Sequence, residues 1–451
     1  MDARAFREYD IRGVAGKEIA DEDVLRMGRT FATYMRRQHK NRIAVGRDCR
    51  ASSPSFRDLL IEGLLAGGMD VVDVGICPSP LLYFALRHLE REGGIMITAS
   101  HNPPEYNGFK ICNGLDTISG PEIQKLRVLM ESGDFSSGKG KLSQYDIVTP
   151  YSDFVLQNIN IPKRLRVGLD AGNSVGGPVA LPLLRKLGCE VHPLYCDMDG
   201  SFPNHEPDPT VLENLTDLIA LVKRESLDVG IAYDGDGDRL GVVDHNGEVV
   251  FGDKLMIIFA REILTRQPGA TFVSEVKCSK TLYDDIEKRG GKAIMWRTGH
   301  SLMKAKMKEV DAVLAGEMSG HMFFKDRFFG FDDGLYASFR LLEILAQSGA
   351  TLPELLQGVP VTYSTPEIRV PCPDDIKFAV VEKAKEHFRA NRLDIIDVDG
   401  ARIVFPDGWG LVRASNTQPV LVLRYEADTM ERLEDIRQLV EGTIERIKNL
   451  T

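Results

Sequence analysis

One alternation of expected strands and helices occurs three times along the chain, and it limits the fold more than any other feature. Each copy contains short apolar runs separated by helical patterns, and the last strand of each copy leads into a polar loop. Such alternation is typical of α/β domains with largely parallel sheets. We expect strands at 42–46, 69–74 and 94–97 in the first copy, 166–169 and 228–233 in the second, and 271–274, 293–296 and 312–314 in the third.

The remainder of the chain follows a different plan. The helices expected in the three copies are 55–66, 81–91, 178–187, 211–223, 254–264, 280–288 and 301–308. After them the pattern changes to an α+β order, with helix 374–390, strands 394–398, 402–405, 410–412 and 420–425, and helix 429–448. The fold class expected is therefore three similar α/β domains, with mixed and largely parallel sheets, followed by an α+β domain.

The length supports several domains, because 451 residues exceed what one hydrophobic core serves. A Gly/Ser-rich stretch at 132–140, a turn at 245–247 and a Gly-Pro segment at 357–360 provide natural linkers. We expect domains at 1–146, 147–247, 248–360 and 361–451. Ligands of open α/β sheets bind beyond the carboxyl ends of the strands, so the polar loops are the first places to look for chemistry.

Composition excludes several classes of protein. The net charge of −10, with no basic tract, argues against a nucleic-acid partner. The longest apolar run, 255–260, is too short to cross a membrane, and the first residues carry no apolar export signal. Seven cysteines without a C-x-x-C pair indicate reduced thiols in a cytoplasmic protein. No stretch demands a subunit interface, so we expect a monomer.

The first polar loop, 98–110, presents Ser100 beside His101, with Lys110 further along. Serine becomes a nucleophile only when a base or an electrophile activates it, and His101 or Lys110 can assist. Taken alone, the segment is better described as a Ser/Asn/Pro turn between two elements.

The second loop carries three carboxylates two residues apart, Asp234, Asp236 and Asp238, followed by Arg239. In an extended loop they point the same way and form an all-oxygen site, which suits Mg²⁺ with a position open for a phosphate oxygen. An EF-hand is excluded, because its sixth position would be Arg239 instead of glycine. A series of Asx-turns is the alternative, but three unpaired carboxylates in one loop would repel each other.

The third and fourth loops offer polar groups to a sugar phosphate. Glu317 and Ser319 can hold vicinal hydroxyls, and His321 can move a proton. The fourth loop joins an arginine, which binds phosphate bidentately, to hydroxyl and amide groups: Arg413, Ser415, Asn416 and Thr417. Ordinary polar turns are the alternative in both places. Further polar candidates, each a surface or satisfied side chain if taken alone, are Tyr9, Arg12, Lys277 and His300.

Two other motifs need to be weighed. Residues 172–176 match G-x-S-x-G and make a serine hydrolase the runner-up class, although such an enzyme has no use for three clustered carboxylates beside an arginine. Residues 133–140 resemble a phosphate-binding loop, but they end in Gly140 where Ser or Thr is needed, and they follow a helical pattern. We interpret them as a linker.

Together the four loops resemble the α-D-phosphohexomutase family, and more narrowly its bacterial phosphomannomutase/phosphoglucomutase group. The family motifs T-[GA]-S-H-N-P-x-x-Y-N-G-x-K, D-G-D-x-D-R, G-E-x-S-G-H and R-x-S-N-T-[EQ]-P are matched, in this order, at 98–110, 234–239, 316–321 and 413–419. Met318 is similar to that group, whereas phosphoglucosamine mutases usually have glutamine there. Ala99 stands where the family commonly has glycine.

The resemblance implies four domains around a central cleft and a phosphorylated Ser100. The phosphoserine would convert mannose or glucose 1-phosphate and 6-phosphate through a glucose or mannose 1,6-bisphosphate. Mg²⁺ would be held by a phosphoserine oxygen at Ser100 and by Asp234, Asp236 and Asp238. Lys110 and Arg239 would lie near the transferring group, with His321 or Lys110 as the general base. Substrate contacts are implied at Tyr9, Arg12, His101, Lys277, His300, Glu317, Ser319, Arg413, Ser415, Asn416 and Thr417.

Other functions stay open at this point. A metal-dependent sugar-phosphate phosphatase would let water intercept the phosphoenzyme, and a phosphoglucosamine mutase would use an amino sugar. A non-catalytic sugar-phosphate-binding protein would not need all three carboxylates. The resemblance places the protein in carbohydrate metabolism, where sugar 1-phosphates feed nucleotide-sugar and polysaccharide synthesis. The sequence ranks neither mannose against glucose nor one downstream product against another.

Overall fold

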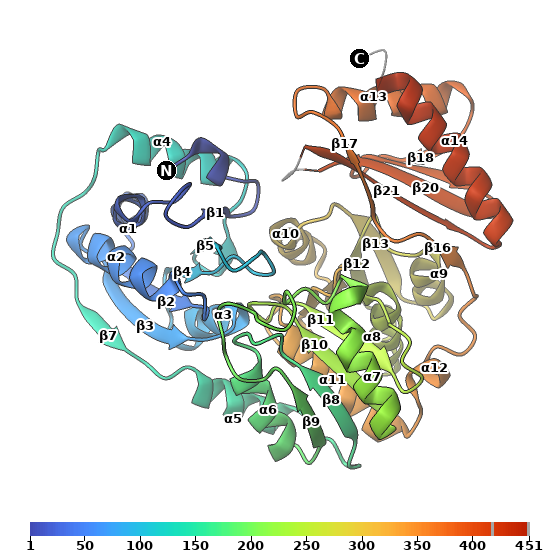
Figure 1. Ribbon diagram of the computed structural model, residues 1–451, viewed down its shortest axis with the longest axis horizontal. Coiled ribbons are helices and arrows are strands. Elements are labelled where there is room, and N and C mark those ends of the chain that lie inside the picture. Colours follow the sequence, from blue (N-terminus) through green and yellow to red (C-terminus); the bar gives the residue numbers. More distant parts are fainter. Residues whose placement is uncertain (416–418, 449–451) are drawn as a thin grey trace.

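The computed structural model describes residues 1–415 and 419–448, and it arranges them as four sheets in chain order (Figure 1). The first sheet has seven strands, the second and third have four each, and the fourth has six. In Figure 1 the first sheet lies at the left, the second below, and the fourth at the upper right beyond the third. The expected fold class, three α/β domains and an α+β domain, is confirmed.

The first three sheets share one strand order, which explains the repeat in the sequence. Their common part reads β5-β4-β2-β3, β11-β10-β8-β9 and β15-β14-β12-β13. In each, three parallel strands are followed by a fourth that runs antiparallel to the last of them. The strands are β2 (Arg42–Arg47), β3 (Asp70–Ile76), β4 (Gly93–Ile97), β5 (Tyr106–Asn113), β8 (Arg166–Asp170), β9 (Glu190–Leu194), β10 (Val229–Tyr233), β11 (Leu240–Asp244), β12 (Thr271–Glu275), β13 (Lys292–Trp296), β14 (Leu314–Gly316) and β15 (Met322–Phe324).

This topology brings the first three polar loops to equivalent places. Each connects the third parallel strand to its antiparallel neighbour, so each lies beyond the carboxyl end of a parallel strand. Backbone hydrogen bonds link the second loop to both neighbouring units: Leu240 N–H, directly after this loop, donates to the Gly320 carbonyl of the third loop at 3.1 Å, and Ser79 N–H of the first unit donates to the Asp236 carbonyl at 2.8 Å. Three copies of one supersecondary unit therefore supply one site.

The helices follow the expected pattern with shifted ends. The helix expected at 211–223 begins at Thr216, because Leu212–Leu215 form a 3₁₀ turn. The one expected at 81–91 spans Ser79–His88, with Pro80 in its first turn, where a missing N–H costs nothing. The helices are α1 (Asp21–Arg36), α2 (Ser53–Ala66), α3 (Ser79–His88), α4 (Pro121–Ser132), α5 (Val148–Asn158), α6 (Gly177–Lys186), α7 (Thr216–Glu225), α8 (Gly252–Arg266), α9 (Lys280–Lys288), α10 (His300–Val310), α11 (Gly334–Ser348), α12 (Leu352–Leu355), α13 (Lys377–Ala390) and α14 (Met430–Lys448).

One apolar core runs through the first three sheets. It contains Phe84 of α3, Leu169 of β8 and Phe324 of β15, and helix α11 adds a nearly continuous set of buried side chains. Tyr233 of β10 shares a hydrogen bond of 2.6 Å with Ser338 of α11, so this helix, although it follows the third sheet, packs on the second. The first three units therefore form one packed body.

The fourth sheet has a core of its own. Its strands are ordered β16-β21-β20-β19-β18, with β17 beside β21, and helices α13 and α14 pack against it. Strands β16 (Tyr363–Ser364), β17 (Ile368–Pro371), β18 (Asp394–Ile396), β19 (Ala401–Phe405), β20 (Gly408–Ala414) and β21 (Val420–Ala427) bury a separate cluster that includes Val412, Tyr425 and Ile436. The first sheet also contains three strands that have no counterpart among the described strands of the second and third sheets: β1 (Ile11–Val14), β6 (Asp116–Thr117) and β7 (Leu142–Gln144).

Among the residues described, no helix combines the length and the apolar character needed to span a membrane. All seven cysteines lie in the described part of the chain, and each is a free thiol.

Candidate active site

Ser100 lies in a constrained turn directly after β4. Its φ of 53° is in the left-handed region, which a non-glycine residue occupies only under outside constraint. Arg50 supplies that constraint from the interior: its guanidinium donates to the carbonyls of Ser100 at 2.7 Å and Asn102 at 2.6 Å. Asp48 in turn pairs with Arg50. Sequence reasoning missed Arg50, because no local motif marks a side chain that acts fifty residues away.

The Ser100 hydroxyl is aimed at the second loop. Its Oγ donates to Asp234 Oδ2 at 2.8 Å, and His101 Nδ1 lies 3.1 Å from the same Oγ. Burial and the nearby Arg239 hold the pKa of His101 well below its usual range, so this ring is neutral. The structure thus brings Ser100, His101 and Asp234 together.

The three carboxylates of the second loop are fully buried and lie within 4.8 Å of one another. Burial and its two neighbouring carboxylates raise the pKa of Asp234 well above its usual value. Burial also opposes ionisation of Asp238, but Lys110 and His321 bring its pKa to about 2. Lys110 Nζ bridges the loop by donating to Asp236 and Asp238, and its own pKa is raised. The nearby positive side chains therefore compensate only part of the negative charge on the three buried carboxylates.

The same carboxylates fit a hard cation. Asp236 Oδ1 and Asp238 Oδ1 are buried and accept no hydrogen bond, whereas both oxygens of Asp234 accept hydrogen bonds. Unused buried carboxylate oxygens are costly unless a cation or a donor meets them. An all-oxygen donor set of this kind suits Mg²⁺ or a similar ion.

The loop can take this shape only because its glycines lack side chains. A Cβ on Gly235 would lie 2.2 Å from the Ser100 carbonyl oxygen, and Gly237 has a φ of 74°. The buried hydroxyl of Ser174 donates to the Asp234 carbonyl at 3.2 Å. The G-x-S-x-G segment therefore supports the carboxylate loop and does not present a nucleophile to solvent.

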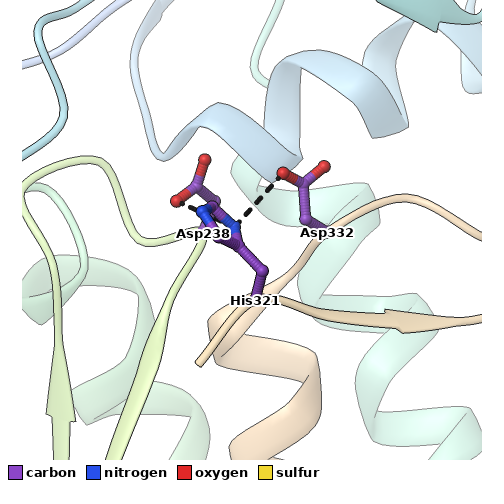
Figure 2. Close-up of side chains that lie close together, drawn as sticks. All are labelled: Asp238, His321 and Asp332. Atoms are coloured by element: carbon purple, nitrogen blue, oxygen red, sulfur yellow. Dashed lines mark ion pairs between the residues drawn. The ribbon is translucent and has the colours of Figure 1, made fainter. Parts of the chain in front are cut away.

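His321 connects the second and third loops (Figure 2). Arg239 Nε donates to His321 Nε2 at 3.0 Å, and the opposite ring nitrogen, Nδ1, lies 3.5 Å from Asp238 Oδ1 and 3.4 Å from Asp332 Oδ2. Burial opposes protonation of His321, yet Asp238 and Asp332 raise its pKa above the usual value. Asp332 escaped the sequence reasoning, because it lies eleven residues beyond the motif in a segment without a recognisable pattern.

A second group of residues is organised by the segment Thr298-Gly299. Gly299 N–H donates to Glu317 Oε1 at 3.0 Å, and the Thr298 hydroxyl donates to Glu275 at 2.6 Å. Glu275 also lies 3.5 Å from Lys277 Nζ, and Ser319 donates to Glu317 at 3.3 Å. Burial and the neighbouring Glu275 raise the pKa of Glu317, while burial and nearby Lys304 lower that of His300 to about 3.

The fourth loop meets this second group through Asp399. Arg413 Nε donates to Asp399 Oδ2 at 3.0 Å, and the same oxygen accepts the Thr298 N–H at 3.1 Å. Ser415 is buried, whereas Asn416 and Thr417 lie outside the residues that the structure describes. Asp399, Glu275 and Thr298 were not anticipated.

The two remaining candidates come from the first unit. Tyr9 donates to the Thr298 carbonyl at 2.9 Å, and its ring meets that of His300 edge-on. Arg12 pairs with Asp10 and donates to Asn102 at 2.6 Å. Tyr9 thus joins the group around Thr298, and Arg12 the group around Ser100.

The fold and this geometry define a four-domain α/β protein with a buried serine set against a carboxylate centre. Family models described as phosphoglucomutase/phosphomannomutase α/β/α domains I, II and III match residues 3–136, 149–247 and 251–363, and the C-terminal domain of the same family matches 367–442. The chain belongs to the phosphoglucomutase/phosphomannomutase family, within the α-D-phosphohexomutases.

Several known proteins resemble it over their full length. A phosphomannomutase/phosphoglucomutase of Pseudomonas aeruginosa is 47% identical over 99% of this chain and 96% of its own. A phosphoglucomutase of Neisseria gonorrhoeae is 44% identical over 98% and 96% of the two chains. The crystal structure of a family member from Burkholderia thailandensis has a TM-score of 0.94 at 42% identity, covering 99% of this chain and 98% of that one.

Proposed function

We propose that this protein is a phosphomannomutase/phosphoglucomutase, which interconverts hexose 1-phosphates and 6-phosphates of mannose and glucose. The observation that carries the proposal is the 2.8 Å contact between the Ser100 hydroxyl and Asp234, at the point where three equivalent loops converge. The name of the relative that is 47% identical supports the same activity. Phosphoryl transfer needs in-line positioning and charge stabilisation, which these loops supply.

In the proposed reaction Ser100 begins phosphorylated. The P–O bond to Ser100 Oγ breaks while a bond forms from phosphorus to a sugar hydroxyl oxygen. The sugar hydroxyl gives its proton to a base, and the departing Ser100 oxygen takes up a proton and becomes a free hydroxyl. The resulting hexose 1,6-bisphosphate, derived from glucose or mannose, turns over in the cleft. It then returns its other phosphoryl group to Ser100, which accounts for a net isomerisation with no loss of phosphate.

His321 is the better candidate for the base, and Lys110 for a fixed cation. Lys110 Nζ already serves two carboxylates, which keeps its proton in place. His321 Nε2 is an acceptor that takes a hydrogen bond from Arg239. When Arg239 turns to a bound phosphoryl group, Nε2 becomes free to accept the substrate proton.

The residues present fit a magnesium ion. Asp236 and Asp238 would offer their unused Oδ1 atoms, and Asp234 and a phosphoserine oxygen at Ser100 would complete the protein's share. A bound Mg²⁺ supplies positive charge that offsets the charge developing on the transferred phosphoryl group. Arg239 and Lys110 add the remaining positive charge nearby.

The substrate would be held from the other group of residues. Glu317 and Ser319 offer an acceptor and a donor to sugar hydroxyls in either orientation of the ring. The phosphate that does not react would be bound mainly by the guanidinium of Arg413, because an arginine side chain matches the geometry of a phosphate group. The proposed substrate contacts are Tyr9, Arg12, His101, Lys277, His300, Glu317, Ser319, Arg413, Ser415, Asn416 and Thr417.

The test is an assay with mannose 1-phosphate, glucose 1-phosphate and glucosamine 6-phosphate, with Mg²⁺ and a trace of glucose 1,6-bisphosphate. We expect comparable isomerisation of the first two and little of the third. Release of free phosphate in place of isomerised sugar phosphate would identify a phosphatase, and preference for the amino sugar would identify a phosphoglucosamine mutase.

Three further expectations belong to the proposal. The domain boundaries are 1–146, 147–247, 248–360 and 361–451, which fall between the four sheets. The protein acts as a monomer, and it does so in the cytoplasm, a compartment that the free thiols support. Its role in carbohydrate metabolism is to supply sugar 1-phosphates for nucleotide-sugar and polysaccharide synthesis.

A further inference from the structure

Asp332 is a buried carboxylate at the centre of several side chains of the site. It lies between β15 and α11 and has no exposed surface. Its Oδ1 lies 3.1 Å from Lys304 Nζ, whereas its Oδ2 lies 3.4 Å from His321 Nδ1 and 3.9 Å from His300 Nδ1. Figure 2 shows the Asp332 carboxylate directed at the His321 ring from the side opposite Asp238.

The contact with Arg239 determines which nitrogen of His321 carries the proton. A guanidinium can only donate, so the 3.0 Å contact from Arg239 Nε requires a lone pair on His321 Nε2. The proton of the neutral ring must then be on Nδ1. That N–H faces two carboxylate oxygens, Asp332 Oδ2 and Asp238 Oδ1.

Of these two carboxylates, Asp332 is the one available to His321 in the working enzyme. Asp238 already accepts from Lys110 through Oδ2, and its Oδ1 is one of the two atoms that suit a cation. Once a cation is bound, Asp238 Oδ1 is engaged with it. Asp332 Oδ2 accepts no hydrogen bond within ordinary limits, so it can tighten on His321 Nδ1–H.

We propose that Asp332 is a positioning residue that fixes the tautomer and the direction of His321, keeping the proton on Nδ1 and Nε2 free to act as a base. This inference rests on the proposed function, in which His321 takes the substrate proton. The carboxylate acts through the ring and does not touch the substrate. A second hydrogen bond that fixes a histidine tautomer is a general device in sites where one ring nitrogen must react.

Asp332 is itself held rigidly, as such a role requires. Its backbone bridges to Phe323 of β15. Lys304, one turn after His300 on α10, also donates to Thr117 of β6 at 2.6 Å and lies 4.5 Å from the centre of the Tyr83 ring. Thr117 and Tyr83 belong to the first domain, whereas Lys304 and Asp332 belong to the third. Lys304 therefore holds the Asp332 carboxylate in place through contacts with both domains.

A second cation held by the same side chains is less consistent with the geometry. Asp238, His321 and Asp332 are close enough to ligate one ion. A ligating nitrogen needs a lone pair, however, and the bond from Arg239 leaves the proton on Nδ1. The arrangement is that of a donor between two acceptors.

The first test reads the tautomer directly in the wild-type protein. Histidine labelled with ¹⁵N would be followed by NMR through couplings from the ring carbons' protons to both nitrogens, with the His321 signals assigned by their loss in His321→Gln. We expect the Nδ1–H form of His321. An Nε2–H form would overturn the proposal whatever the enzyme's activity.

The second test compares Asp332→Asn with Asp333→Asn. Asp333 is a matched control, because it is the adjacent buried carboxylate but accepts from Tyr336 N–H and the Tyr151 hydroxyl instead of facing His321. Asp332→Asn should lower kcat about 100-fold, the range of general acid–base catalysis, with KM within threefold and a changed tautomer ratio. Asp333→Asn should lower the melting temperature and leave the tautomer ratio as it is.

The possible outcomes distinguish a failure of the proposed function from a failure of the positioning role alone. If the wild type isomerises no hexose phosphate, the proposed function fails, while the tautomer measurement still tests the geometry. If the wild type is an active mutase and Asp332→Asn keeps full kcat with an unchanged tautomer, the positioning role fails alone. Equal loss of kcat in both variants would also overturn it, because that result indicates a general structural effect.

Discussion

The two ends of the site are built differently. The reacting end, around Ser100 and the three aspartates, lies where the first three domains share one apolar core, and backbone hydrogen bonds link the carboxylate loop to the first and third units. The anchoring end, around Arg413, belongs to a domain whose core cluster, among the residues described, contains no residue of the other three domains. The first end is fixed by packing, and the second is attached by individual polar contacts.

The contacts between the third and fourth domains are mostly ionic or polar. Lys277 pairs with Glu367 at 3.0 Å, Arg402 donates to the Val276 carbonyl at 2.6 Å, and Lys280 N–H donates to Glu426 at 3.0 Å. The apolar contribution is a small cluster around Trp409 and Leu411. Such an interface resembles those between domains that move relative to each other. This difference indicates that the reacting end of the site is rigid, whereas the anchoring end can adjust its position relative to it.

The largest expected effect tests the reacting end. Ser100→Ala should lower turnover on the order of 10⁴-fold or more, because the phosphoryl carrier is gone. Intact-mass measurement should show a phosphoryl group on the wild type and none on the variant. Ser174→Ala, which alters a buried serine near the same loop, is the matched control and should keep its phosphoryl mass. Full activity of Ser100→Ala would end the phosphoserine mechanism.

The next effect concerns the carboxylates. Asp236→Asn should lower kcat about 10²–10³-fold and weaken metal binding, because one buried oxygen suited to the cation is replaced by an amide. Calorimetric titration with Mg²⁺ and steady-state kinetics would measure the two effects separately. Asp199→Asn, at an exposed carboxylate of the same domain, should change neither. A change in KM alone would contradict the assignment.

Much of this arrangement could be predicted from the sequence, because its signals are local. The loops follow short apolar strands. Three carboxylates within five residues repel each other in any backbone conformation, so they indicate a bound cation. The strands after the loops were harder to foresee: Met322–Phe324 has only three residues. Helix Gly334–Ser348, which is buried almost all round, was not expected from the sequence.

The supporting side chains could not be predicted, because they act across long stretches of chain. Arg50 orders the Ser100 turn from fifty residues away, and Asp399 reaches Thr298 across about a hundred. No spacing rule connects such pairs. Their roles follow only from the topology that brings equivalent loops together. The motif residues were thus accessible to sequence reasoning, and their partners were not.

A moderate effect is expected at the anchoring end. Arg413→Ala should raise KM about 10- to 100-fold, with kcat within a few fold, since a charged hydrogen bond contributes about 1.5–3 kcal/mol. Arg413→Lys should recover part of the affinity, because lysine keeps the charge but not the bidentate geometry. If Arg413→Ala lowers kcat as much as Asp236→Asn does, the division between the two ends is wrong.

The smallest effect tests how the two ends are joined. The Lys277 ammonium beside Glu367 lowers the pKa of this carboxyl from 4.5 to about 2. A carboxyl whose pKa is lower in the folded state stabilises the fold above its unfolded pKa and loses that stabilisation as the pH falls toward 2. The shift corresponds to about 3 kcal/mol at neutral pH.

Glu367→Gln should therefore be less stable than the wild type at pH 7, and the difference should shrink between pH 5 and pH 3. Urea unfolding followed by tryptophan fluorescence would measure it, because Trp409, one of the two tryptophans, lies in the small cluster between the third and fourth domains. Glu382→Gln is the control: it removes an ion pair within α13 whose glutamate is largely exposed, and we expect no comparable pH trend.

Because Glu367 holds Lys277 and not Ser100, kcat should stay within twofold while KM rises a few fold. A loss of kcat without a change in stability would mean that the ion pair belongs to the reacting end, and that the two ends are less separate than their cores suggest.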